Sequence, residues 1–407
     1  MNVLFVHEVD YLAKVVFDIH FLAEALSLRG HNVYAIDYEN TWKRRSFFDF
    51  GSLETRRVDR VSRAFTGASV AVRHPGFIKI PGISRLSASF THYREIGRTI
   101  REKSIDAVIL YSVPTNGLQT IRLAHKAGIP VLFRSIDILN RLVPYAVLRP
   151  VTRLMEKKVY AGADMVIPNT PQYLKYVISM GAPESRVKLV PFPVDTTLFR
   201  PLPDTDELRQ KWGLGKGPVI VFIGTLFKFS GMDAFIREFP RVLKAVPEAR
   251  LLIVGDGPLC PELERIISAL DMQKQVTITG FQPYADMPQY INLATVCINT
   301  FNVTDYTMDM FPAKIMQYVA CGKATVATAL RGIMTILPGE SHGVVYVNNA
   351  AQMANEVTSL LTSDERRRKL ESAGLDYIKE NHSCDKIAIK LEEVLTAAIK
   401  EKQNGKT

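Results

Sequence analysis

Residues 199–224, FRPLPDTDELRQKWGLGKGPVIVFIG, divide the chain into two parts. The stretch begins with two prolines and turn-forming Asp and Thr residues, passes through one short helical pattern, and ends in a new apolar strand. On both sides of it, apolar runs of strand length alternate with helical patterns, which is typical of parallel, doubly wound sheets. The 407 residues also exceed the roughly 250 to 300 at which a single core stops growing. We therefore predict two α/β domains joined by a linker over residues 199–212.

The alternation predicts a set of elements in each part. In the first part we expect a helix over 16–29 and strands over 3–6, 33–36, 107–111, 130–133, 165–168 and 187–190. In the second we expect strands over 218–223, 251–254, 276–279, 295–299 and 325–327, with helices over 231–245, 261–270, 286–292 and 312–320. An amphipathic helix over 386–400 ends the chain and could pack on either domain. Because open α/β sheets bind ligands beyond the carboxyl ends of their strands, we expect the functional site there.

The composition is that of an ordinary globular protein, with 47% hydrophobic and 23% charged residues. No apolar run reaches the roughly 20 residues of a membrane span, and the first residues lack a signal-peptide pattern. The four cysteines show no C-x-x-C spacing, which favours reduced thiols. We expect a cytoplasmic protein.

The positive charge is concentrated in the first half. Residues 1–200 contain 28 of the 51 basic side chains but only 17 of the 41 acidic ones. Residues 41–105 combine basic side chains, among them Arg73 and Lys79, with Trp42, Phe47, Phe77 and other aromatics, a mixture that suits an anionic membrane surface. A solvated basic face without a partner is the alternative. We expect no nucleic-acid partner, because no recognised nucleic-acid module accompanies the charge.

Residues 308–322, MDMFPAKIMQYVACG, predict an anion site. Proline favours the first turn of a helix, so a helix starting at Pro312 would leave the N–H groups of Ala313 and Lys314 unpaired. Such N–H groups, together with the Lys314 ammonium, would favour a bound phosphate.

This stretch resembles the retaining GT-B glycosyltransferases of family 4, whose second domain carries two acidic residues eight positions apart before a small residue and a glycine. Asp309 and Gln317 have that spacing here. Four further stretches resemble the same family in the same order: LRGHNV (28–33), VPFPVDTTLF (190–199), LIVGDGP (252–258) and VTITGF (276–281). The resemblance implies two Rossmann-like domains facing each other across a cleft. It also implies a hexosyltransferase-type enzyme that moves a sugar from a nucleotide diphosphate sugar to a hydroxyl, with retention.

The resemblance also implies roles for individual residues. Asp309 would contact the donor sugar, Gln317 the ribose, and Asp137 would orient the reacting sugar on the acceptor side. For Asp137 a helix cap ahead of Leu139 is the alternative. The other donor-binding residues would be Gly224, Thr225, Lys228, Ser230, Phe281, Ala313 and Lys314. The sequence departs from the family at several of these positions. Thr225 and Ser230 replace an Arg and a Lys of the phosphate loop, and Gln317 replaces a Glu. Ile136 replaces a His, and Ala13 with Lys14 replaces a glycine pair.

The expected domains are 1–198 for the acceptor, 199–385 for the donor, and a helical segment 386–407 that could return to the first domain. We expect no cofactor and no metal, because helix ends and basic side chains neutralise the leaving diphosphate in this architecture. Asp204 and Asp206 form a D-x-D motif, which we interpret as helix capping. The expected partners are a nucleotide sugar and a glycan or glycolipid acceptor. We also expect contact, through residues 41–105, with the anionic inner face of the cell membrane.

Two alternatives remain. The substitutions at Thr225, Ser230, Gln317 and Ile136 favour a catalytically silent subunit that binds nucleotide sugar. A GT-B epimerase or phosphorylase would share the fold. Formation of a new nucleotide sugar without an acceptor would mark an epimerase, and a requirement for free phosphate would mark a phosphorylase.

Overall fold

A computed structural model of the chain describes residues 1–14, 16–38, 50–80, 83–141, 143, 146–203 and 206–405. The chain forms two compact units, one of Met1–Pro193 with Cys384–Thr407 and one of Val194–Ser383. The unit boundary therefore lies upstream of residue 199, because Val194 pairs with Ser383 in an isolated bridge and its N–H donates to the His382 carbonyl at 2.7 Å. Asp204 and residues 41–49, which the sequence singled out, lie outside the described residues.

The first unit is built on a seven-stranded sheet within the described ranges, in the order β3-β4-β2-β1-β5-β6-β7. Its strands are β1 (Asn2–Val6), β2 (Asn32–Ile36), β3 (Thr55–Val61), β4 (Val70–Pro75), β5 (Ala107–Leu110), β6 (Val131–Ser135) and β7 (Met165–Pro168). All neighbours pair in parallel except β3 and β4, so the expectation of a purely parallel sheet is wrong at this edge. The predicted strand over 187–190 is also wrong, since only Val187 bridges to Val166.

Helices cover both faces of this sheet. They are α1 (Asp18–Leu28), α2 (Ser84–Glu102), α3 (Gly117–Ala127), α4 (Arg149–Gly162), α5 (Pro171–Ser179) and α14 (Cys384–Asn404). Apolar residues of α1 and α14 share one core with alternate residues of β1 and β5, while α2, α3, α4 and α5 share the core on the opposite face. Short 3-10 turns, Leu139–Arg141, Ala146–Leu148 and Glu184–Arg186, complete the unit.

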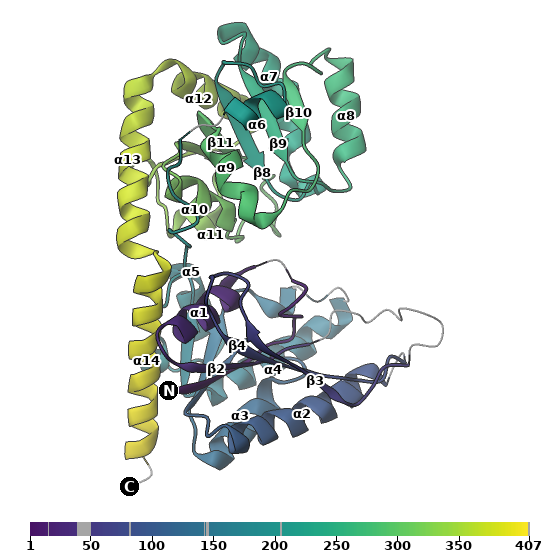
Figure 1. Ribbon diagram of the computed structural model, residues 1–407, viewed down its shortest axis with the longest axis vertical. Helices are drawn as coiled ribbons and strands as arrows, with labels where there is room; N and C mark the ends of the chain where they lie inside the picture. The colour runs from purple at the N-terminus through teal and green to yellow at the C-terminus, as the bar shows by residue number, and fades with distance from the viewer. Residues whose placement is uncertain are drawn as a thin grey trace. The chain divides into compact units, whose positions relative to one another are not determined.

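The last helix belongs to the first unit. α14 packs beside α1 (Figure 1), with Ile387, Leu391 and Leu395 fully buried. Arg29 Nε donates to Glu392 at 2.8 Å, and Lys402 Nζ donates to Asp164 at 2.6 Å. The amphipathic pattern seen at the end of the sequence thus buries its apolar face against the helix that follows β1.

The second unit has a six-stranded parallel sheet among its described residues, in the order β10-β9-β8-β11-β12-β13. Its strands are β8 (Val219–Ile223), β9 (Arg250–Val254), β10 (Val276–Ile278), β11 (Val296–Asn299), β12 (Thr325–Thr328) and β13 (Val344–Val347). Its helices are α6 (Asp206–Lys211), α7 (Met232–Ala245), α8 (Cys260–Ala269), α9 (Met287–Asn292), α10 (Ala313–Ala320), α11 (Arg331–Met334), α12 (Ala350–Thr362) and α13 (Asp364–Asn381). The 3-10 turns are Lys228–Ser230, Tyr284–Asp286 and Glu340–His342.

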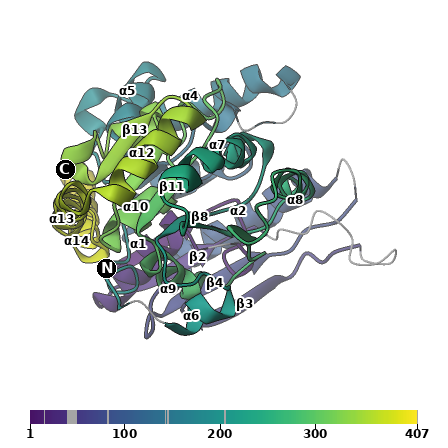
Figure 2. The same ribbon diagram turned by 90° about the horizontal axis from the view of Figure 1, so that it is seen from above.

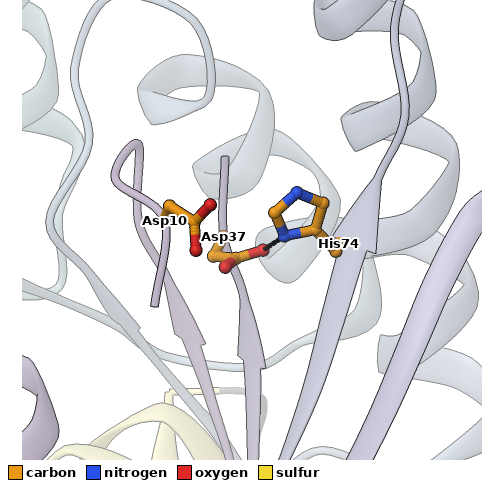
Figure 3. Close-up of side chains that lie close together, drawn as sticks. All are labelled: Asp10, Asp37 and His74. Carbon is orange, nitrogen blue, oxygen red and sulfur yellow. Dashed lines mark ion pairs between the residues drawn. The ribbon is translucent and has the colours of Figure 1, made fainter. Parts of the chain in front are cut away.

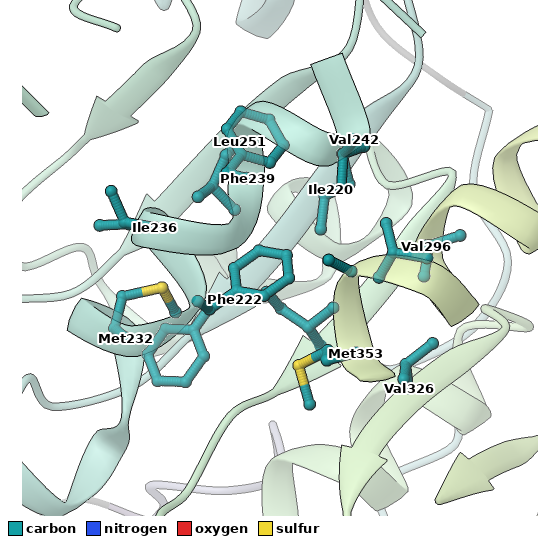
Figure 4. Packing of buried hydrophobic residues seen from close by; sticks show 14 of the residues in the cluster. Ile220, Phe222, Met232, Ile236, Phe239, Val242, Leu251, Val296, Val326 and Met353 are labelled. Atoms are coloured by element: carbon teal, nitrogen blue, oxygen red, sulfur yellow. The ribbon is translucent and has the colours of Figure 1, made fainter. Parts of the chain in front are cut away.

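Side chains on alternate positions of β8 fill two separate cores. Ile220 and Phe222 pack in a cluster with α7, α8 and α12 (Figure 4), while Val219 and Val221 join α9 and α10 on the other face. α7 and α12 lie side by side over the first of these faces (Figure 2). Because the strands are parallel, all their carboxyl ends meet at one edge, and β8 lies at its centre between β9 and β11.

Candidate active site

Glycines let the loops at the carboxyl edge of the second sheet approach one another. Gly224 follows β8 and Gly255 follows β9, both at φ +147°. A Cβ on Gly255 would lie 2.0 Å from the carbonyl oxygen of Gly224, so a larger residue cannot occupy that position without a shift. The Gly224 N–H donates to the Val254 carbonyl at 2.9 Å. β8 therefore ends in bare backbone, against which a long side chain can lie.

The Lys314 ammonium occupies this space. A Cβ on Gly224 would lie 2.3 Å from Lys314 Nζ, and the ammonium stands 4.3 Å from the ring centre of Phe222 and 4.7 Å from that of Phe301. Burial lowers the pKa of Lys314 to about 7. Among the residues that the structure describes, no carboxylate forms an ion pair with it. A partly desolvated cation without a counter-ion at the centre of the strand ends is suited to bind an anion.

The start of α10 adds backbone donors next to this cation. Pro312 has extended ψ (93°) and is the N-cap, so the predicted helix start at Pro312 is wrong by one residue and Ala313 is the first helical residue. The N–H of Ile315 donates to the Pro312 carbonyl at 3.0 Å. The positive end of the α10 dipole thus lies beside Lys314, which favours negative charge at this place.

Asp309 precedes α10 and Gln317 lies within it, and each already has a protein partner. Asp309 Oδ1 lies 3.1 Å from Arg331 Nη2 at the start of α11. Gln317 Nε2 donates to the Tyr284 hydroxyl at 3.2 Å, and the Tyr284 ring packs edge-on against Phe199 at 5.6 Å. The amide of Gln317 thus retains its Oε1 acceptor for a hydroxyl, as ribose binding would need.

The loop between β8 and α7 carries three of the expected donor-binding residues, Thr225, Lys228 and Ser230. Thr225 is exposed after Gly224, but Lys228 Nζ points to Glu262 at 3.0 Å and to Asp233 at 3.2 Å, which raises its pKa. Without a ligand, Lys228 is therefore paired with acids of α8 and α7 and does not lie with Lys314 at the centre of the strand ends. Ser230 is fully buried, and its hydroxyl has no protein partner in the described ranges.

Phe281 lies on the loop after β10 and exposes 77% of its surface. It follows Gly280, whose φ of +71° turns the chain at the end of the edge strand. β9 separates β10 from β8 in the sheet, so Phe281 belongs to the same edge but not to the group around Lys314. An exposed ring at the edge of the strand ends is available for stacking with a nucleobase.

Asp137 lies in the first unit, two residues beyond β6. The residue reaches solvent, but the protein around its carboxyl group, with a smaller effect from the Asp18 carboxylate, raises the pKa to about 6. Lys14 opposes this rise by its positive charge. Asp137 can therefore change its protonation close to neutral pH, which suits a residue that contacts a reacting hydroxyl.

A buried ion pair under this loop was not anticipated from the sequence. Arg134, on β6, donates from Nε and Nη2 to the two oxygens of Asp18 at 3.0 and 2.6 Å, and the Tyr111 hydroxyl donates to the same carboxylate at 2.7 Å. Arg134 also donates to the Val190 carbonyl. The available signal was a single arginine inside the apolar run VLFRS, a residue type that is almost never buried unless it is paired.

Asp10, Asp37 and His74 form the group of ligand-type side chains found in the described ranges (Figure 3). One ligand atom of each lies within 4.8 Å of the others, beyond the carboxyl ends of β1 and β2 and on β4. His74 Nδ1 lies 2.7 Å from Asp37 Oδ1, while Asp37 Oδ2 accepts the Tyr11 N–H at 2.8 Å. Burial raises the pKa of Asp37, against the opposing effect of His74.

Protein groups already use the atoms that a metal would need. Besides the Asp37 contacts, Asp10 Oδ1 accepts the N–H groups of Leu12 and Ala13, both at 2.9 Å. These bonds hold the loop after β1, the place where the family has a glycine pair. The group therefore has a structural role, although its residue types could also hold a divalent cation.

The described part of the segment 41–105 only partly fits the predicted basic and aromatic surface. Phe77, Arg73 and Lys79 are buried, the first in a small cluster with Tyr38 and the second in an ion pair with Asp59 at 2.8 Å. The prediction that these three residues belong to an exposed basic and aromatic surface is therefore wrong. α2, by contrast, exposes a row of apolar side chains, Leu86 (72%), Phe90 (63%) and Tyr93 (43%).

The chain matches two family models, one for each unit. Residues 217–363 match "Glycosyl transferases group 1" and residues 15–193 match "Glycosyl transferase 4-like domain". Together with the two parallel-sheet α/β units, these matches show that the chain belongs to the group 1 glycosyltransferases of GT-B architecture. It is a glycosyltransferase enzyme of hexosyltransferase type.

Individual relatives agree with this assignment. The chain is 27% identical, over 80% of its length and 83% of the relative's, to a GDP-mannose-dependent alpha-(1-6)-phosphatidylinositol monomannoside mannosyltransferase of Mycolicibacterium smegmatis. It is 26% identical, over 63% of its length and 57% of the relative's, to a D-inositol 3-phosphate glycosyltransferase of Segniliparus rotundus.

Solved structures share the fold at lower identity. HepE of Anabaena, crystallised in complex with UDP, has a TM-score of 0.72 at 17% identity and covers 98% of this chain and 100% of its own. Sucrose-phosphate synthase of Thermosynechococcus elongatus has a TM-score of 0.68 at 15% identity, with 98% and 99% covered. Across the ranges that the structure describes, no helix combines the length and the apolar character needed to cross a membrane.

Proposed function

We propose that this glycosyltransferase moves a sugar from a nucleotide diphosphate sugar to a hydroxyl of a lipid-linked glycan, with retention at the anomeric carbon. The observation that carries the donor part is the Lys314 ammonium beside Gly224 and the start of α10, where a diphosphate would meet a cation and free backbone donors. The relatives' names support it, since one uses GDP-mannose and acts on a phosphatidylinositol mannoside. No metal has a part in this proposal.

The remaining roles follow the same geometry. Gln317 would accept a ribose hydroxyl through Oε1, Asp309 would accept hydroxyls of the donor sugar, and Phe281 would stack on the base. Thr225, which is exposed, would border the phosphates without charge, whereas Ser230 is fully buried and would not contact them directly. Asp137, in the first unit, would orient the reacting sugar through its carboxylate.

A metal-free thermal-shift titration with UDP, GDP, ADP and their common sugar conjugates, in the presence of EDTA, tests the donor. A ligand at 100 times its Kd stabilises by about 2.7 kcal/mol, which raises Tm by roughly 5 to 10 °C for domains of this size. We expect a shift with one nucleotide family, followed by sugar transfer to a glycolipid acceptor and, by NMR, a product that keeps the donor's anomeric configuration. The absence of any shift would overturn the proposal.

A silent binding subunit is the second candidate. It is favoured by the neutral residues Thr225 and Ser230 and by the ion pairs that occupy Lys228. A thermal shift with one nucleotide family, but neither donor hydrolysis nor transfer across many acceptors, would support this candidate over the enzyme.

Substitution Asp137→Asn should lower kcat by about 10- to 100-fold, because a neutral amide accepts hydrogen bonds more weakly than a carboxylate. With its pKa at about 6 in the ligand-free protein, the wild-type carboxylate is protonated at lower pH, so kcat/KM should fall as pH drops through 6. The variant should lack this acid limb. The thermal shift with the donor nucleotide should stay unchanged, and an acid limb that persists in Asp137→Asn would contradict the role.

A further inference from the structure

α4 presents an outer face of unusual composition. Every exposed side chain between residues 147 and 158 is apolar or basic. Four apolar residues expose about half or more of their surface: Val147 (81%), Leu148 (49%), Val151 (56%) and Leu154 (56%). Interleaved with them are the exposed basic residues Arg149, Arg153, Lys157 and Lys158. We call these eight residues the α4 face.

The carboxylate of this helix is turned inward. Glu156 is fully buried, and its oxygens accept from Asn140 Nδ2 at 2.7 Å and from the hydroxyls of Tyr160 and Tyr176, both at 3.1 Å. Its negative charge is thus satisfied inside the unit. The outer face of the helix carries positive charge alone, which distinguishes it from an ordinary solvated helix with mixed signs.

An open groove of about 540 Å³ runs along the α4 face and is lined by Asn140, Arg149, Pro150, Arg153, Leu154 and Lys157. Three cations and two apolar side chains suit a phosphodiester headgroup with an attached acyl chain. Asn140 lies three residues beyond Asp137, so the groove adjoins the loop that carries the proposed acceptor residue.

From these observations we infer that the α4 face docks the enzyme on a bilayer rich in anionic phospholipid. Val147, Val151 and Leu154 enter the interface, and Arg149, Arg153 and Lys157 bind phosphodiester headgroups. This inference rests on the proposed lipid-linked acceptor. It adds the surface by which the enzyme reaches that acceptor, because docking through the α4 face would bring the membrane next to the loop that carries Asp137. Amphipathic helices with basic and apolar faces bind membranes in this manner, and two signals together give stable association.

The test compares binding to vesicles of phosphatidylcholine alone with binding to vesicles that contain phosphatidylglycerol, by sedimentation at low salt. Each basic residue near an anionic surface contributes roughly fivefold, so Arg149→Gln/Arg153→Gln/Lys157→Gln should lower the partition coefficient for anionic vesicles by about 100-fold. Val151→Ser/Leu154→Ser should lower it by about tenfold or more. Lys390→Gln/Lys400→Gln on α14, also exposed, removes two charges away from the α4 face and is the control; it should bind like the wild type.

The outcomes separate this inference from the proposed function. Vesicle binding needs no turnover, so it can support the α4 face even if no transfer is found. If transfer is found, the basic triple variant should lose turnover on acceptor embedded in anionic vesicles and retain it on a short-chain acceptor in solution. Equal vesicle binding by the triple variant and the wild type would overturn the inference. The inference would also be overturned if the α4 face binds a second copy of the chain. In that case light scattering would show a dimer, and Val151→Ser/Leu154→Ser would abolish the dimer without changing vesicle binding.

Discussion

Substitution Lys314→Met is expected to weaken binding of the donor nucleotide by about 10- to 100-fold at pH 6.5, because it removes a charge-assisted hydrogen bond to the diphosphate. Methionine keeps an apolar stem between the Phe222 and Phe301 rings, so the loss would come from the charge. Isothermal titration calorimetry with the nucleotide identified by the thermal-shift screen measures it.

The pH dependence gives the same prediction a second readout. The pKa of Lys314 is about 7 without ligand, so above this pH the Lys314 amine must take up a proton when the anion binds, and the wild-type Kd should rise up to tenfold per pH unit. Below pH 7 the ammonium is already charged and this dependence disappears. Lys314→Met should bind with the same weak affinity on both sides of pH 7.

The control variant is Lys228→Met, whose ammonium is already paired with Glu262 and Asp233. It should change the Kd by less than about threefold, since exposed ion pairs contribute little. Lys314→Met should also leave the ligand-free Tm unchanged or slightly higher. A Lys whose folded-state pKa is depressed costs folding stability at pH values below its unfolded pKa of about 10.4, so its removal relieves that cost. A larger loss of affinity in Lys228→Met than in Lys314→Met would contradict the assignment.

The sequence predicted most of the second unit because its elements follow strict periodicities. Every strand expected between residues 218 and 327 is present within one or two residues, and so are the four helices. β13 was missed, since four residues of VVYV between two loops carry too little pattern to separate a strand from an apolar turn. Once β12 is in place, β13 completes the sheet by tertiary pairing, which local sequence does not encode.

The first unit was harder to predict, because the sequence of its edge strand is as rich in charge as an exposed loop. β3, TRRVDRV, carries three arginines and was included in a basic segment, and the structure places it at an antiparallel edge where exposed charges are expected. Phe77 and Lys79 were assigned to the same surface and are buried. Which aromatic residues of a mixed segment turn inward depends on long-range packing, here against Tyr38 and α2.

At the site, the sequence located the ends of strands and helices better than the direction of long side chains. Gly224 and Lys314 were named separately, and the structure brings them into contact, since both lie at the same sheet edge. Lys228 was named for the same anion and turns to Glu262, thirty-four residues later in the chain. A flexible lysine takes the nearest carboxylates, and a single sequence does not reveal which carboxylates those are.

Substitution Arg134→Met should destabilise the first unit by about 3–5 kcal/mol, because among the described residues it leaves the buried Asp18 carboxylate with only the Tyr111 hydroxyl as a side-chain donor. At roughly 2 to 4 °C per kcal/mol, Tm should fall by about 10 °C in calorimetry. Arg29→Met is the control, since its partly exposed pair with Glu392 should contribute less than about 1 kcal/mol. The double variant Asp18→Asn/Arg134→Met should recover part of the lost stability.

The single variant Arg134→Met should also shift the acid limb of activity above pH 6, because the Asp18 charge, no longer neutralised, raises the pKa of Asp137 further. Equal stability of Arg134→Met and Arg29→Met would show that the buried pair does not hold β6 to α1.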